Sequence, residues 1–271
     1  MPITKRGTSY IDKGEGKPLL LLHGWCMDKT VWQQQISALC ENHRVIAPDL
    51  AGHGDSVSLA PQAGSFEEYA TEVIHLAEQL NLHEMTIIGW SMGAQVLLKA
   101  YKQLQRRVSA LVLIGATPCF TKNNDFPFGL DFDEVRGMGL KLRRNQTKAL
   151  DGFLQKMFAA GELDDPQQRT KVTEILANIK QPATEAALNG LDALMTENLQ
   201  AEAVAINCPA LIIHGASDTI CLPQAGSWLA DKIDHSRFLL YENCGHAPFL
   251  SNPLRFNNDL LHFLGKVYAN S

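Results

Sequence analysis

Short, nearly continuous apolar runs alternate with longer amphipathic stretches along this chain. Six runs have the length and composition of buried strands: 17–24, 44–49, 85–89, 108–114, 209–215 and 237–241. Helical spacing of apolar positions is found near 31–41, 66–81, 92–105, 223–233 and 253–267. Such strands are typical of a parallel sheet that is covered on both faces. The alternation predicts a doubly wound α/β fold, with an antiparallel edge strand or two from residues 1–11.

One stretch, 119–204, interrupts this alternation because it contains no good strand candidate. Four segments in it have helical patterns: 133–144, 147–160, 166–179 and 184–194. We interpret the stretch as a helical cap inserted between two strands of the sheet. The predicted organisation is therefore an α/β core of residues 1–118 and 205–271 with a cap of 119–204. The alternative is a set of ordinary helices packed on the sheet.

Composition narrows the function only slightly. The 271 residues include 45% apolar and 20% charged residues, and the formal net charge is −5. These values are ordinary for a soluble globular protein and argue against a nucleic-acid-binding face. We expect neither a membrane span nor a signal peptide. The six cysteines are scattered without CxxC spacing, which favours a reducing cytoplasm over a disulfide framework or a zinc site.

The charge is distributed unevenly within the predicted cap. Between Arg136 and Lys156 there are six basic residues and one acid, Asp151, so the local net charge is +5. This inversion can be a solvated helix face or a docking site for an acidic partner. The sequence leaves both interpretations open.

The pentapeptide Gly89-Trp90-Ser91-Met92-Gly93 is the strongest chemical signal. It follows an apolar strand and opens a helical pattern. Glycines allow a sharp turn that lifts the serine hydroxyl clear of the sheet, and the helix N-terminus offers backbone N–H groups to an oxyanion. We predict that Ser91 is a nucleophile. The alternative is an ordinary tight turn with a capping serine.

A nucleophilic serine needs a base and an acid that orients the base. His246 lies in a loop after the last predicted strand, between Gly245 and Ala247-Pro248, which is a poor place for a core histidine. Asp218 follows the preceding strand, at the edge of the sheet where functional loops gather. We predict His246 as the base and Asp218 as its acid. A turn or capping role is the alternative for Asp218.

The second oxyanion donor is expected in the loop after the first long strand, which reads His23-Gly24-Trp25-Cys26. We propose the backbone N–H groups of Trp25 and Met92 as the two donors. The other histidines and Asp49 are interpreted as structural. Because the sequence has no HExxH, GxGxxG or GxxxxGK[ST] motif, we expect no metal and no nucleotide cofactor.

These motifs resemble the α/β-hydrolase superfamily over essentially the whole chain. Within it, the sequence is most similar to the pimeloyl-[acyl-carrier protein] methyl ester carboxylesterases. The likeness rests on 22–25, 89–93, Pro118-Cys119-Phe120 and 246–249. The resemblance implies an α/β-hydrolase fold and hydrolysis of the methyl ester of pimeloyl-carrier protein in biotin biosynthesis, with release of methanol. It also implies that the N–H groups of Trp25 and Met92 bind the oxyanion.

The resemblance extends into the cap. It implies that a segment beginning with Phe-Leu lines the acyl channel; this segment comprises Phe153, Leu154, Gln155, Lys156 and Met157. It further implies that basic cap residues contact the acidic carrier, for which the candidates are Arg143, Arg144, Lys148 and Lys156. The expected partner is an acyl ester on a carrier protein, with no nucleic acid or membrane, and the enzyme is expected to be a monomer.

Two other functions fit the same residues. One is a broad short-chain esterase, a lipase or a carbon–carbon bond hydrolase that uses the same triad, because substrate choice depends on the cap. The other is a non-catalytic ligand receptor that keeps the hydrolase fold. Slow or absent turnover with tight ligand binding would favour the receptor.

Overall fold

A seven-stranded sheet forms the centre of the molecule in the computed structural model, which describes residues 2–57 and 65–269. The strand order is β1-β3-β2-β4-β5-β6-β7. The strands are β1 (Tyr10–Lys13), β2 (Pro18–Leu22), β3 (Arg44–Pro48), β4 (Met85–Trp90), β5 (Val108–Ile114), β6 (Ala210–Gly215) and β7 (Ser236–Tyr241). The six predicted apolar runs are all strands, so the predicted α/β architecture is confirmed.

All neighbouring strands are parallel except β1, which pairs antiparallel with β3. Every residue of β4 and β6 is buried, as expected for central strands covered on both faces. The predicted N-terminal edge strand lies mainly after residue 9, because residues 4–8 form a turn in which the Gly7 N–H donates to the Thr4 carbonyl at 3.0 Å. Only an isolated bridge joins Ile3 to Ser9.

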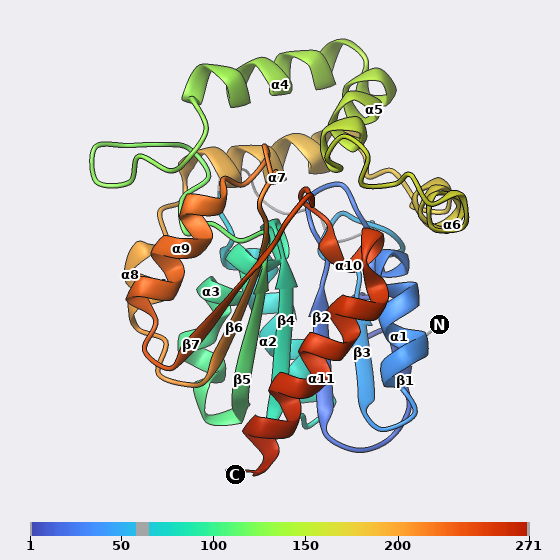
Figure 1. Cartoon of the computed structure of the whole chain (residues 1–271), viewed down its shortest axis with the longest axis vertical. Coiled ribbons are helices and arrows are strands. Elements are labelled where there is room, and N and C mark those ends of the chain that lie inside the picture. Colours follow the sequence, from blue (N-terminus) through green and yellow to red (C-terminus); the bar gives the residue numbers. More distant parts are fainter. Residues whose placement is uncertain (1, 58–64, 270–271) are drawn as a thin grey trace.

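Helices cover both faces of this sheet (Figure 1). α1 and α11 pack together on one face, whereas α2 and α3 pack together on the other. Their bounds are α1 (Gln33–Leu39), α2 (Glu67–Gln79), α3 (Met92–Leu104), α9 (Pro223–Lys232) and α11 (Pro253–Ala269). Among the residues that the structure describes, no helix is long and apolar enough to cross a membrane.

The helices between β5 and β6 are α4 (Phe132–Arg144), α5 (Gln146–Lys156), α6 (Pro166–Ala177), α7 (Thr184–Thr196) and α8 (Gln200–Val204). The four predicted helices of this stretch are therefore present. α4, α5 and α7 lie beyond the end of the sheet, above the carboxyl ends of the parallel strands (Figure 1). Asn145 and Asp165 begin α5 and α6 by accepting hydrogen bonds from backbone N–H groups of the first turn.

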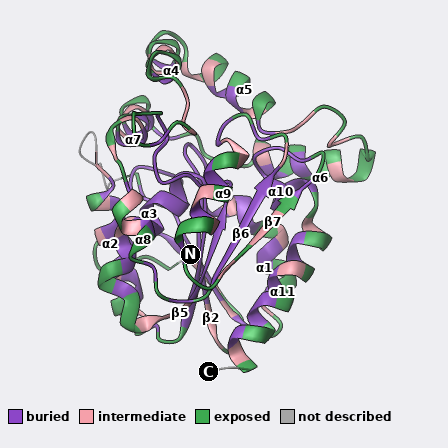
Figure 2. Cartoon of the chain, turned by 60° about the vertical axis from the view of Figure 1, so that its left-hand side comes forward, coloured by how far each residue is buried: buried purple, intermediate pink, exposed green. Residues whose placement is uncertain are grey.

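These helices are packed differently from the core helices. α4 buries only Val135 and Leu142, whereas ten of the thirteen residues of α3 are buried. Figure 2 shows the same contrast, with α4 and α6 largely exposed and the central strand β6 buried. α8, in contrast, packs against α3 beside the core.

Candidate active site

Ser91 lies in the sharp turn between β4 and α3. Its backbone has φ 55° and ψ −120°, a conformation that is costly for a residue with a side chain. The turn leaves no space at its two glycines: a Cβ on Gly93 would lie 2.3 Å from the Leu22 carbonyl oxygen, and one on Gly89 would lie 2.6 Å from the Cα of Ala94. The glycine spacing of the pentapeptide is therefore a steric requirement of this turn.

Asp218 and His246 are paired at the same edge of the sheet, and both side chains are fully buried. The Nδ1 of His246 lies 2.7 Å from the Oδ2 of Asp218, while the Oδ1 accepts hydrogen bonds from the backbone N–H groups of Ile220 and Cys221 at 2.8 and 3.0 Å. A carboxylate only accepts, so Nδ1 carries the proton of a neutral imidazole and Nε2 is left as the basic nitrogen.

The electrostatics of Asp218 keep it ionised. Burial by itself favours its neutral form, but the electrostatic interaction with the His246 imidazole and hydrogen bonds from His214 and His246 together hold the pKa of Asp218 well below its ordinary value. His214 also lies with its Nε2 2.8 Å from the Cys221 carbonyl oxygen, which confirms its expected contact with a backbone group. The Asp218 carboxylate is thus held by His246, by His214 and by the backbone N–H groups that follow it.

His246 is placed beside the serine turn by Trp90. The indole N–H of Trp90 donates to the His246 carbonyl at 2.9 Å, and the two rings are 5.5 Å apart. Among the described residues, Nε2 of His246 has no hydrogen-bond partner. Catalytic hydrogen bonds are often loose in a ligand-free site and tighten on binding. The structure thus brings Ser91, Asp218 and His246 to one edge of the sheet.

The loop that carries Trp25 lies against the start of α3, because Gly93 packs on the Leu22 and His23 carbonyls. Among described acceptors, none takes a hydrogen bond from the backbone N–H of Trp25 or Met92. The two predicted oxyanion donors are therefore available. The Trp25 side chain contacts the inserted helices: its indole N–H donates to the Ala187 carbonyl of α7 at 2.8 Å, and its ring meets that of Phe153 edge-on.

Two buried histidines brace this loop. His23 accepts from the Leu50 N–H at 2.9 Å through Nε2, and His53 accepts from the Cys26 N–H at 3.3 Å. Burial lowers the pKa of His23 to about 4; burial and the nearby His23 lower the pKa of His53 to about 3. Both are therefore neutral structural groups at pH 7, as the sequence predicted.

The structural role expected for Asp49 is likewise confirmed. Its carboxylate accepts hydrogen bonds from the backbone N–H groups of Lys29 and Asp55 at 2.9 and 2.7 Å, and it pairs with the Lys29 ammonium. Asp55 in turn pairs with Lys180, which follows α6. No group of three or more potential metal ligands occurs within residues 2–57 and 65–269.

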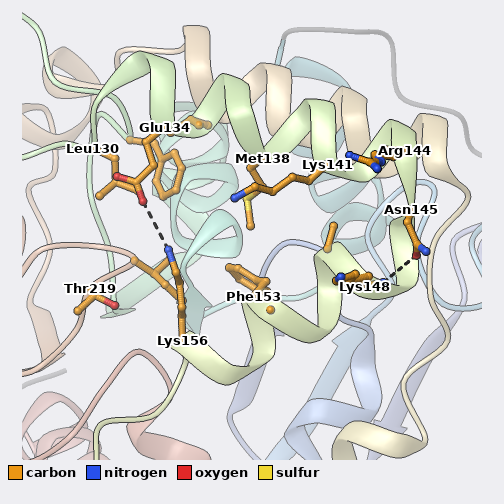
Figure 3. Close-up of a pocket in the computed structure, with 15 residues that line it drawn as sticks. Leu130, Glu134, Met138, Lys141, Arg144, Asn145, Lys148, Phe153, Lys156 and Thr219 are labelled. Carbon is orange, nitrogen blue, oxygen red and sulfur yellow. Dashed lines mark hydrogen bonds and ion pairs between the residues drawn. The ribbon is translucent and has the colours of Figure 1, made fainter.

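A cavity of about 660 Å³ lies between α4, α5 and the loop that follows Asp218 (Figure 3). Apolar side chains form much of its wall: Phe120, Leu130, Val135, Met138, Ala149, Phe153 and Ile220. Four basic residues also line it: Lys141, Arg144, Lys148 and Lys156. Thr219 and Ile220 connect the cavity to the acid of the pair, although the cavity wall within the described residues does not include Ser91 or His246.

The segment predicted to line an acyl channel is only partly on this wall. Phe153 and Lys156 line the cavity, since residues three apart share one face of a helix. Leu154 and Gln155 are turned away from the cavity by the helical rotation, and Gln155 is exposed. Met157 follows the end of α5, and its carbonyl accepts the His246 N–H at 2.7 Å. Of the five residues predicted to line an acyl channel, Phe153 and Lys156 therefore lie on the wall of this cavity.

The basic residues predicted to contact a carrier are also divided. Arg144, Lys148 and Lys156 border the cavity, and Lys156 pairs with Glu134 at 3.5 Å (Figure 3). Arg143 lies on the other side of α4, where it borders a separate groove shared with α7. The predicted cluster is thus three residues around the cavity, with Arg143 outside it.

Sequence reasoning missed Glu162, which lies between α5 and α6 and touches the loop of His246. Its carboxylate accepts hydrogen bonds from the Gly245 N–H at 2.7 Å and from the Cys244 thiol at 3.0 Å. No local motif marks this residue, because its partners are more than 80 positions away along the chain.

Comparison with known proteins places these features in a wider context. A family model described as alpha/beta hydrolase fold matches residues 17–253. A pimeloyl-[acyl-carrier protein] methyl ester esterase from Nitrosomonas europaea is 35% identical over 244 residues, which are 90% of this chain and 94% of that protein.

Two solved structures are similar over nearly the whole chain. The esterase EaEST from Exiguobacterium antarcticum has a TM-score of 0.87 and 27% identity, and the match covers 96% of each chain. A bromoperoxidase from Bacillus anthracis has a TM-score of 0.86 and 29% identity, covering 96% of this chain and 95% of that one. Because these neighbours bear different activity names, the fold does not by itself identify a substrate.

Proposed function

Because the chain belongs to the alpha/beta hydrolase fold family, we propose that it is a serine carboxylesterase with Ser91, His246 and Asp218 as its catalytic triad. The observation that carries this proposal is the buried Asp218–His246 pair, which leaves Nε2 unpartnered among the described residues beside the strained Ser91 turn. An oriented base next to a serine hydroxyl is the arrangement that acyl transfer needs.

In the proposed mechanism, His246 Nε2 takes the proton of Ser91 as its oxygen bonds to the ester carbonyl carbon. The backbone N–H groups of Trp25 and Met92 hold the resulting oxyanion, and each such donor contributes about 2.7–4 kcal/mol to the transition state. His246 then protonates the departing alcohol, which leaves as methanol from a methyl ester. Water repeats the attack on the acyl-enzyme and releases the acid.

We propose the methyl ester of pimeloyl-acyl-carrier protein as the substrate, in biotin biosynthesis. The Nitrosomonas europaea relative bears that name, and the cavity offers the matching chemistry. Its apolar wall suits an acyl chain, and its basic residues suit an acidic carrier or an anionic linker. Residues 119–204 would act as a cap that covers the core of 1–118 and 205–271 and determines which substrate binds.

The other parts of this proposal concern the state of the enzyme in the cell. The six unpaired cysteines support a reducing compartment, the cytoplasm. We propose a monomer, because the triad and the cavity are built from one chain. A second candidate function is a broad short-chain esterase, which the likeness to EaEST favours.

The test compares kcat/KM for the carrier-linked pimeloyl methyl ester with kcat/KM for free methyl pimelate and short p-nitrophenyl esters. Preference for the carrier-linked ester supports the proposed substrate, and equal values support the broad esterase. Complementation of a biotin-requiring strain that lacks this esterase step, with Ser91→Ala as the matched control, gives the physiological answer.

A further inference from the structure

The loop that carries His246 is held from outside the core by the segment that follows α5. The His246 N–H donates to the Met157 carbonyl at 2.7 Å, and the preceding Gly245 N–H donates to Glu162 at the same distance. The Cys244 thiol donates to the other oxygen of Glu162 at 3.0 Å. Three consecutive residues of the loop are therefore hydrogen-bonded to one six-residue stretch, 157–162, between α5 and α6.

Glu162 is the centre of this contact. One of its carboxylate oxygens accepts from both the Gly245 N–H and the Ala159 N–H, at 2.7 and 2.6 Å, and the other accepts from Cys244. Its own N–H donates back to the Ala159 carbonyl at 3.1 Å, which fixes the turn that presents the carboxylate. A single half-buried side chain thus joins its own turn to the base loop.

The fit between these two segments is tight. A Cβ on Gly245 would lie 2.4 Å from the Met157 carbonyl oxygen and 3.0 Å from the Ala159 N. Burial, with the hydrogen bond to Glu162, raises the pKa of Cys244, so the thiol stays protonated and remains a donor. Without the carboxylate, the Gly245 N–H and the thiol would lose this acceptor in a partly buried place, where an unpaired donor is unfavourable.

We infer that Glu162 is a positioning residue for the base: its carboxylate fixes the Gly245 backbone and thereby sets the imidazole of His246 relative to Ser91. This inference rests on the proposed function. Glu162 does not touch the reacting atoms, and its effect on the rate comes from geometry, since a displacement of about 1 Å in a catalytic group can cost about 100-fold.

The test replaces Glu162 with alanine and with glutamine. Glu162→Ala removes all three acceptor contacts, and we expect kcat for p-nitrophenyl acetate to fall about 10- to 100-fold with KM within about twofold. Glu162→Gln keeps an amide oxygen for the Gly245 and Ala159 N–H groups, and its NH₂ faces the sulfur of Cys244, a weak acceptor. We therefore expect Glu162→Gln to recover kcat to within about threefold of wild type.

Asp165→Asn is the matched control. Asp165 is an acid three residues away whose carboxylate accepts, within the described residues, from the Gln167 N–H of its own helix at 2.9 Å. The variant tests whether loss of any carboxylate from this segment lowers kcat, and thermal unfolding of each variant reports general damage. Labelling of Ser91 by a fluorophosphonate supplies a second rate that depends on His246 but not on the choice of substrate.

Slow labelling and low kcat in Glu162→Ala, with rescue by Glu162→Gln and normal kcat in Asp165→Asn, support the inference. Wild-type kcat and labelling in Glu162→Ala overturn it, as does an equal loss in Asp165→Asn or no rescue by glutamine. If wild-type enzyme is labelled at Ser91 but ignores the carrier-linked ester, the substrate proposal fails and the inference on Glu162 stands. If Ser91 is not labelled in wild-type enzyme, both fail.

Discussion

The sheet edge that carries Asp218 and His246 and the basic wall of the cavity differ in burial and in how their charged groups are paired. At the sheet edge, Asp218 and His246 are fully buried and held by short hydrogen bonds. Across the cavity, Lys141, Arg144 and Lys148 are exposed and have no ion-pair partner within the described residues. Under the proposed function, this contrast separates two tasks: the buried residues carry out bond cleavage, and the exposed basic residues contact the carrier of the ester.

Removal of the nucleophile should have the largest effect on the buried side. We expect Ser91→Ala to lower kcat for small and carrier-linked esters by about 10⁶-fold, because no other described hydroxyl occupies the strained turn. Steady-state assays with p-nitrophenyl acetate measure this, and Ser217→Ala, an exposed serine next to Asp218, is the control. Undiminished activity in Ser91→Ala would refute the proposed triad.

Removal of the charge of Asp218 should be the next largest effect. Asp218→Asn presents an amide to His246 and favours the wrong tautomer, so we expect kcat to fall about 10⁴-fold with little change in KM. The pH dependence of kcat/KM and the fluorophosphonate labelling rate check this on the same samples. A change in KM alone would assign Asp218 to substrate binding instead.

The buried imidazoles His23 and His53 should make stability depend on pH. Their folded-state pKa values, about 4 and about 3, lie below the ordinary 6.5, so the unfolded chain binds protons first as the pH falls. The free energy of unfolding should therefore decrease from pH 6.5 towards pH 4, by up to about 1.4 kcal/mol per pH unit for each group. Urea unfolding at pH 7, 6 and 5 measures the slope. His53→Gln should make it shallower, and a flat profile in wild type would contradict this account.

The smallest predicted effect concerns the exposed side. Arg144→Glu combined with Lys148→Glu reverses two cavity charges, and we expect KM for the carrier-linked ester to rise about 10-fold while small esters are unaffected. Arg143→Glu is the matched control, since Arg143 faces the groove beside α7. If KM changes equally for the carrier-linked ester and the small esters, the basic residues are only a solvated helix face.

The sequence predicted what depends on local pattern. The strands followed from continuous apolar runs, and the turn at Ser91 followed from glycine spacing that the structure explains sterically. The placement of Asp218 and His246 together followed from strand order, although their catalytic roles remain proposals. The resemblance assigned the whole segment 153–157 to an acyl channel, because the rotation of α5 that puts Phe153 and Lys156 on the cavity wall could not be fixed from residues alone. Glu162 was not found because its partners are distant in sequence.

Two of the hydrogen bonds between the inserted segment and the loops of Trp25 and His246 use a main-chain carbonyl of the insert. Trp25 bonds the Ala187 carbonyl, and the His246 N–H bonds the Met157 carbonyl. A main-chain carbonyl is present whatever side chain accompanies it, so many substitutions on α5 and α7 would preserve these two anchors. The design lets the substrate-facing surface diversify, by evolution or by engineering, without rebuilding the catalytic centre, provided that the helix backbones keep their course.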